Sequence, residues 1–137
     1  MDAPGRNAWV GGALVAGVAY FVVGKVFALP PDHLRAWRLA AWAVSAIVYA
    51  AHIAHEHFRL RFSPGLAALH VALAAALGGF LLAVAGMANS LRLEPTIKPL
   101  WLLALVAWPL ITGVPAYLVA WVGLTLLGRM TRQTGSA

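Results

Sequence analysis

Most of the ionisable side chains that this sequence places in an apolar setting lie in one short region. His52, His55, Glu56 and His57 follow one another closely, and His70 comes thirteen residues later. Imidazole and carboxylate groups bind protons, divalent metals and haem iron. His52, His55 and His70 are therefore candidate ligands of haem b or a divalent metal, together with Glu56, and they are also candidate proton carriers.

The spacing of these residues does not favour a metal site. The motifs that bring two ligands from one helix onto one metal are H-E-x-x-H, E-x-x-H and H-x-x-x-H, and the sequence contains none of them,. We therefore expect no resident metal or other cofactor. Haem b or a divalent metal held by these histidines stays an alternative.

Glu56 is the one acidic residue that the sequence places at membrane depth, where ionisable residues are commonly functional,. Arg59 follows three residues later, a spacing at which two side chains meet on a helix. We expect Glu56 to form a local ion pair with Arg59, close to Arg61, in a turn at the membrane interface. The histidines of this turn are then expected to be partly solvated among lipid headgroups.

The segment 36–59 has two distinct helical faces. At 100° per residue its polar side chains fall within an arc of about 80°. This polar seam consists of Arg38, Ser45, Tyr49, His52, Glu56 and Arg59. Alanines, among them Ala50 and Ala54, repeat on the opposite face, and neither face is typical of a helix surrounded by lipid alone.

The composition indicates a membrane protein, with 62% hydrophobic and 10% charged residues in 137,. Four apolar segments are long enough to cross a bilayer, which takes about 20 residues: 8–29, 36–58, 65–90 and 99–127. Pro30 and Pro31 separate the first two. We predict an all-α, polytopic integral membrane protein, a single domain over residues 1–137 formed by an antiparallel bundle of four transmembrane helices. Basic residues divide evenly between the two predicted membrane faces, so the positive-inside rule assigns no orientation.

Two of these segments carry features that bear on helix packing. The third has small residues at steps of four and three, which allow close approach of another helix. The candidate helix-packing residues are Ala50, Ala54, Ala72, Gly79, Ala83 and Gly86. In the fourth segment Pro109 and Pro115 flank Thr112 and Gly113, so we expect a kink or a break into two half-helices,. Broken helices expose backbone carbonyls that line substrate or ion sites in transporters.

These features favour helix association as the function, either as a homo-oligomer or as an accessory subunit of a larger membrane complex. One neighbour within the bundle cannot cover both faces of the second helix. The first alternative is a small transporter or channel lined by the second helix and the broken fourth helix. The second is a membrane haem- or metal-binding protein that uses His52 or His55 with His70.

The sequence does not indicate an enzyme, because its serines lack a Gly-x-Ser-x-Gly setting and it has no paired carboxylates,. The expected partners are the lipid bilayer and other transmembrane helices, from a second copy or a partner subunit, and not nucleic acid. The expected location is a cell (inner) membrane.

Overall fold

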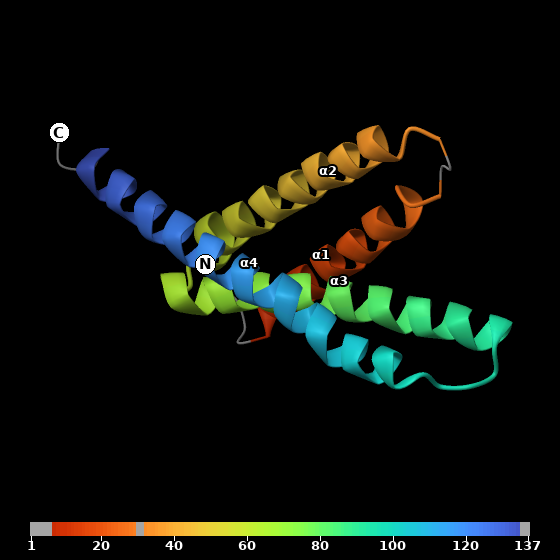
Figure 1. The fold of residues 1–137 in the computed structure, drawn as a ribbon. Helices are drawn as coiled ribbons and strands as arrows, with labels where there is room; N and C mark the ends of the chain where they lie inside the picture. Colours follow the sequence, from red (N-terminus) through yellow and green to blue (C-terminus); the bar gives the residue numbers. More distant parts are fainter. Residues whose placement is uncertain (1–6, 30–31, 135–137) are drawn as a thin grey trace.

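The computed structural model describes residues 7–29 and 32–134, with side chains described as far as residue 130. Within these ranges the chain is helical apart from short connections, and it contains no strand. The elements in chain order are α1 (Ala8–Val26), α2 (Leu34–His55), the π-helical turn η1 (Glu56–Leu60), α3 (Pro64–Leu93) and α4 (Pro99–Thr134) (Figure 1). Pro30 and Pro31 lie outside the described residues.

The local sequence explains where several of these helices begin and end. α3 starts at Pro64, whose missing N–H is no loss in a first turn, where backbone donors lack helical partners in any case,. The helical run of α2 continues past His55 into η1, where the Arg61 N–H donates to the Glu56 carbonyl at 2.9 Å. Arg61 then adopts a left-handed backbone conformation, with a φ of 54°, and ends the run,.

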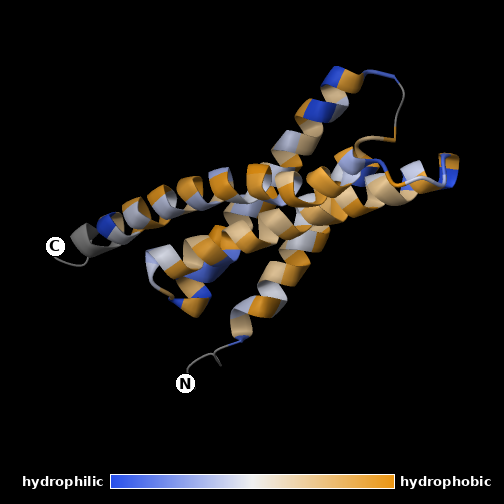
Figure 2. Cartoon of the chain, turned by 60° about the horizontal axis from the view of Figure 1, so that its bottom comes forward, coloured by the Kyte–Doolittle hydropathy of each residue, from blue (hydrophilic) through white to orange (hydrophobic). Residues whose placement is uncertain are grey.

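The described residues include four helical segments that are long and apolar enough to cross a membrane. They comprise 19, 27, 30 and 32 residues, whereas about 20 residues span the hydrocarbon core of a bilayer,. Figure 2 shows hydrophilic residues gathered at helix ends and in the connections, while the middle parts of the helices are mostly hydrophobic. The protein is therefore an all-helical chain built from segments of membrane-spanning length.

α3 is the central helix of the fold and packs against both α1 and α4 (Figure 1). It carries half of the buried residues in the described part of the chain, and many of these are small: Ala67, Ala68, Ala72, Ala74, Gly78, Gly79 and Ala83. A Cβ atom on Gly78 would lie 2.6 Å from the Cβ atom of Tyr20, so α1 and α3 approach nearly to backbone contact. α2 lies at the periphery, and within Leu34–His55 the one buried residue is His52.

The small-residue face that the sequence places on the third segment lies largely against α4. A Cβ atom on Gly79 would lie 2.6 Å from Thr112 Oγ1, and one on Gly86 would lie 2.6 Å from the Trp101 ring. Ala72 and Ala83 are buried as well. On α2, by contrast, Ala50 is exposed and Ala54 is half-buried.

α4 runs without interruption from Pro99 to Thr134, although Pro109 and Pro115 lie inside it. The expected break into two half-helices is therefore wrong, while the expected kink stays a prediction. Close packing against α3 holds both halves of α4 in one helix. The Thr112 hydroxyl lies 2.9 Å from the Trp108 carbonyl and 3.2 Å from the Ala75 carbonyl of α3, which gives backbone oxygens near the prolines an additional donor,.

The contact between α1 and α3 predicts a strong effect of a single methyl group. We expect Gly78→Ala to lower the free energy of unfolding by about 1–3 kcal/mol, because the new Cβ atom meets the rigid Tyr20 Cβ atom rather than a flexible side-chain end,. Thermal unfolding in mild detergent measures the effect. Gly123→Ala is the matched control, since nothing lies within 4 Å of its Cβ position. Equal stability of the two variants would contradict the close contact.

Candidate functional site

The Glu56 side chain lies fully buried between two histidines. His70 Nδ1 lies 3.0 Å from Glu56 Oε2, within hydrogen-bonding distance,. His52 Nε2 lies 3.6 Å from Glu56 Oε1, an ion-pair separation that is longer than a hydrogen bond,. We call these three residues the Glu56 site. Its members come from α2, η1 and α3, although His70 lies fourteen positions after Glu56 in the chain.

The end of α2 positions two members of the site. His52 precedes Glu56 by four residues, so the two side chains lie on the same helical face,. The π-helical turn starts at Glu56, and turns of this kind occur frequently at functional sites,. Two members of the polar seam, His52 and Glu56, are thus buried inside the fold. The two ends of the seam, Arg38 and Arg59, are exposed.

Aromatic rings enclose the third member. The Trp9 ring of α1 stacks on the His70 ring at a centroid separation of 4.2 Å and an interplanar angle of 4°. Phe62, in the connection before α3, presents its edge to the same imidazole at 5.0 Å. The two rings contact an imidazole whose exposed fraction is 4%.

The site has unused hydrogen-bonding capacity. Both ring nitrogens of His52 and the Oε1 atom of Glu56 are buried without a hydrogen-bond partner. Buried polar atoms are nearly always paired, and unpaired ones often mark a functional site. A neutral imidazole offers one donor and one acceptor, and a carboxylate offers acceptors alone. The unpaired atoms can therefore receive one additional proton without any change in the packing.

Charge balance points to the same chemistry. A carboxylate with two neutral imidazoles carries one negative charge, and one bound proton makes the site neutral overall. Burying a net charge is costly, whereas burying a paired and neutral group costs much less. In such a cluster the proton belongs to the group as a whole rather than to one residue. The Glu56 site therefore has the composition and geometry of a proton-binding centre.

The structure changes two expectations drawn from the sequence. The ion pair of Glu56 with Arg59 is wrong, because Glu56 points inward to His70 and His52, while Arg59 and Arg61 are exposed, where water or headgroups solvate their guanidinium groups,. Partial solvation is also wrong for His52 and His70, whose exposed fractions are 5% and 4%. His55, in contrast, is exposed, and His57 is half-buried.

The remaining seam residues lie further along α2. Tyr49, one turn before His52, donates a hydrogen bond from its hydroxyl to the Ala116 carbonyl of α4. Ser45 is half-buried. On α1, the Tyr20 hydroxyl is buried without a hydrogen-bond partner. These tyrosine hydroxyls extend the polar groups of the fold beyond the Glu56 site.

The described residues offer no group of three or more histidine, cysteine or acidic side chains arranged to hold a metal ion. In the Glu56 site, His70 already uses Nδ1 for Glu56, and its ring stacks on Trp9. His55 is exposed, on the side of the site that faces Gly12. The arrangement therefore lends no support to the haem or metal alternative.

Three residues of the site region could not be assigned a role from the sequence: Trp9, Gly12 and Phe62. Trp9 contacts His70 across a long stretch of chain, and Phe62 contacts it from the preceding connection. Aromatic residues near the ends of apolar segments are common in membrane proteins. Gly12 reads as part of a small-residue face. The one signal in the sequence is the tryptophan near the start of the first hydrophobic segment, and it does not show that Trp9 contacts His70.

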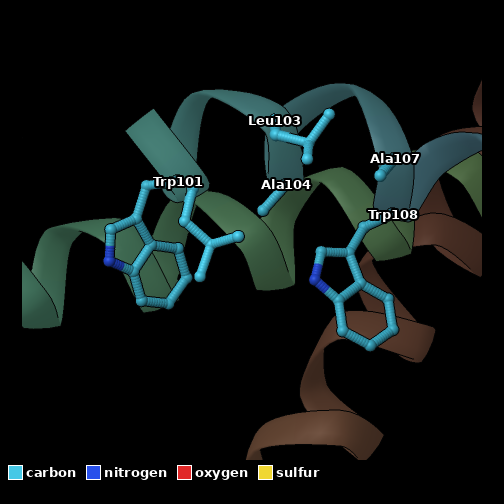
Figure 3. A pocket seen from close by; sticks show the side chains of 6 residues that line it. Trp101, Leu103, Ala104, Ala107 and Trp108 are labelled. Carbon is cyan, nitrogen blue, oxygen red and sulfur yellow. The ribbon is translucent and has the colours of Figure 1, made fainter. Parts of the chain in front are cut away.

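The two hollows described on the surface are not lined by members of the Glu56 site. One, of about 350 Å³, lies beside the first part of α4 between the rings of Trp101 and Trp108 (Figure 3). Another, also of about 350 Å³, lies between α3 and α4 near Pro109 and Gly113. Both are lined mainly by apolar and aromatic side chains, and Tyr117, in the second hollow, is the one ionisable residue among them.

Comparison of this chain with protein-family models, curated proteins and solved structures finds no match. The described residues form an all-helical fold with four segments of membrane-spanning length and a buried glutamate between two histidines.

The stacking of Trp9 on His70 makes Trp9 a reporter of proton binding. A protonated imidazole quenches a stacked indole more strongly than a neutral one, so we expect the Trp9 emission to fall in one step on acidification. The difference between the fluorescence titrations of the wild type and of Trp9→Phe isolates this signal. His70→Gln should remove the step, whereas a step of the same size in His70→Gln would show that His70 does not bind the proton.

Proposed function

We propose that this chain is a small multi-pass protein of a cell (inner) membrane, an antiparallel four-helix bundle that binds and releases a proton at the Glu56 site. We further propose that it moves protons, alone or coupled to a solute, across the membrane. The observation that carries this proposal is a fully buried carboxylate between two buried histidines, with one carboxylate oxygen and two ring nitrogens unpaired. Ionisable residues at membrane depth commonly mark proton relays and ion pathways.

The depth of the site supports proton exchange with one side of the membrane. His70 lies six residues after the first residue of α3, which corresponds to about 9 Å along the helix axis,. The exposed turn with Arg59 and Arg61 lies at the same end. A proton from the aqueous phase on this side therefore has a short distance to travel.

Tyrosine hydroxyls support a continuation of the path. Tyr49 lies one turn from His52 on the inward face of α2 and links α2 to the Ala116 carbonyl. Tyr20, on α1, holds a buried hydroxyl without a partner. A hydroxyl both donates and accepts hydrogen bonds, which is the property that a proton relay requires.

Proton flux into liposomes tests the proposal. With the membrane potential clamped and a pH-sensitive dye enclosed, we expect the wild type to acidify the interior faster than protein-free liposomes do. Glu56→Gln should reduce this flux about 100-fold or to background, the scale on which a positioned proton carrier acts. Glu94→Gln is the matched control, because Glu94 is exposed and pairs with Lys98 at 2.7 Å. Equal flux in Glu56→Gln and the wild type would refute the role of Glu56.

A second candidate function is helix association through α2, as a homo-oligomer or as an accessory subunit of a larger complex. One observation favours it: the inward turn of the polar seam leaves the alanine face of α2 outside, with Ala50 exposed. Exposed small residues let another helix approach closely, whereas a helix face that contacts lipid alone does not require small residues. The two candidates are compatible, because they use opposite faces of α2.

Association predicts that a larger side chain on this face separates the copies. We expect Ala50→Leu to raise the dissociation constant of the oligomer about tenfold, which corresponds to about 1.4 kcal/mol. Single-molecule photobleaching in lipid vesicles measures the distribution of states. Ala88→Leu is the control, since Ala88 is exposed on α3. A wild type that is monomeric at all protein densities would eliminate self-association.

A further inference from the structure

We propose that His55 is the proton donor from the aqueous phase to the Glu56 site, and that Gly12 keeps the space between His55 and His52 open. This inference rests on the proposed proton-binding function, and it assigns the route by which the proton arrives. His55 is exposed, whereas His52, three residues earlier on the same helix, has a side chain that is 3% exposed. The pair thus joins the surface to the buried site.

The geometry around Gly12 places both imidazole rings near one point on α1. A Cβ atom on Gly12 would lie 3.8 Å from His55 Nε2 and 3.9 Å from His52 Nε2. Both nitrogens therefore approach the same point on α1, where glycine contributes no side chain. A bulkier residue here would fill the space next to both imidazoles.

The unpaired nitrogens of His52 give the route its direction. His52 Nε2 has no hydrogen-bond partner, and it faces the unpaired Glu56 Oε1 at 3.6 Å. His52 can therefore accept a proton on the side of Gly12, and Glu56 can accept that proton from His52. No rearrangement of a helix is required for a proton to pass from one imidazole to the other.

The transfer balances in three steps. Neutral His55 takes a proton from water and becomes an imidazolium. It passes that proton to the Nε2 atom of neutral His52, directly or through one water, and returns to the neutral form. After the His52 ring turns toward Glu56, Nε2–H donates the proton to the Glu56–His70 pair through Glu56 Oε1, so that His52 is again neutral and the pair, which shares the proton, carries no net charge,.

Among the described residues, few ionisable groups lie around this route. Glu56 on η1 and His70 on α3 face the inner end, and His55 forms the outer end. α1 contributes Gly12 and Trp9, neither of which ionises. α4 contributes the Ala116 carbonyl, which does not ionise and accepts a hydrogen bond from the Tyr49 hydroxyl of α2. Arg59 and Arg61 are exposed in the adjoining turn.

The rate of proton uptake tests this route, and it is measured separately from the equilibrium protonation of the Glu56 site. The protein is placed in phosphatidylcholine–phosphatidylglycerol nanodiscs and acidified by photolysis of a caged proton. The Trp9 emission then reports protonation at His70. We expect His55→Ala to slow uptake about 100-fold while the midpoint of the fluorescence titration stays in place. Imidazole in the buffer should restore the rate. His57→Ala, on the same turn, is the matched control and should leave the rate unchanged.

A second variant tests the space at Gly12. Gly12→Val should slow proton uptake as His55→Ala does. In the double variant with Gly12→Val and His55→Ala, imidazole in the buffer should not restore the rate. An unchanged rate in His55→Ala, or an equal loss in His57→Ala, would overturn the proposal, and so would the absence of any pH-dependent Trp9 signal in the wild type. If His55→Ala slows uptake but the wild type shows no Glu56-dependent flux in liposomes, the route stands and the transport function fails.

Discussion

The burial of the Glu56 carboxylate is the constraint on which the rest of the fold depends. A carboxylate without exposed surface is tolerated when charged or polar partners surround it, and here His70 and His52 supply them,. Those partners come from different helices, so α2, η1 and α3 must meet at one place. Removal of either histidine would leave a buried charge poorly compensated, which links the stability of this end of the fold to its chemistry.

Close helix packing provides the precision that the Glu56 site needs. Gly78 lets α3 approach α1 until Tyr20 nearly touches its backbone, and the same pair of helices brings Trp9 onto the ring of His70. On the other side of α3, Gly79 and Gly113 hold α4 close, and α4 stays continuous through two prolines. The small residues of α3 therefore do more than permit association, because they fix the position of the imidazole that binds Glu56.

Part of this arrangement can be predicted from the sequence. Segment length and composition predict four helices long and apolar enough to span a membrane, and the structure has them. The spacing of four between His52 and Glu56 predicts their common face. The position of His70 cannot be predicted in the same way, because the rotation of α3 about its axis follows from packing with α1 and α4. The π-helical turn that begins at Glu56 cannot be predicted from periodicity either, and it changes the helical spacing on which the expected ion pair of Glu56 with Arg59 rests.

The most direct measurement is nitrogen nuclear magnetic resonance of the histidine side chains in lipid bilayers across a range of pH. Single histidine-to-glutamine variants assign the signals of His52 and His70. The account predicts that the two histidines titrate together, with His70 Nδ1 hydrogen-bonded to Glu56, and that Glu56→Gln uncouples them. Two histidines that titrate independently, or that stay in one protonation state across the range, would contradict a shared proton at the Glu56 site.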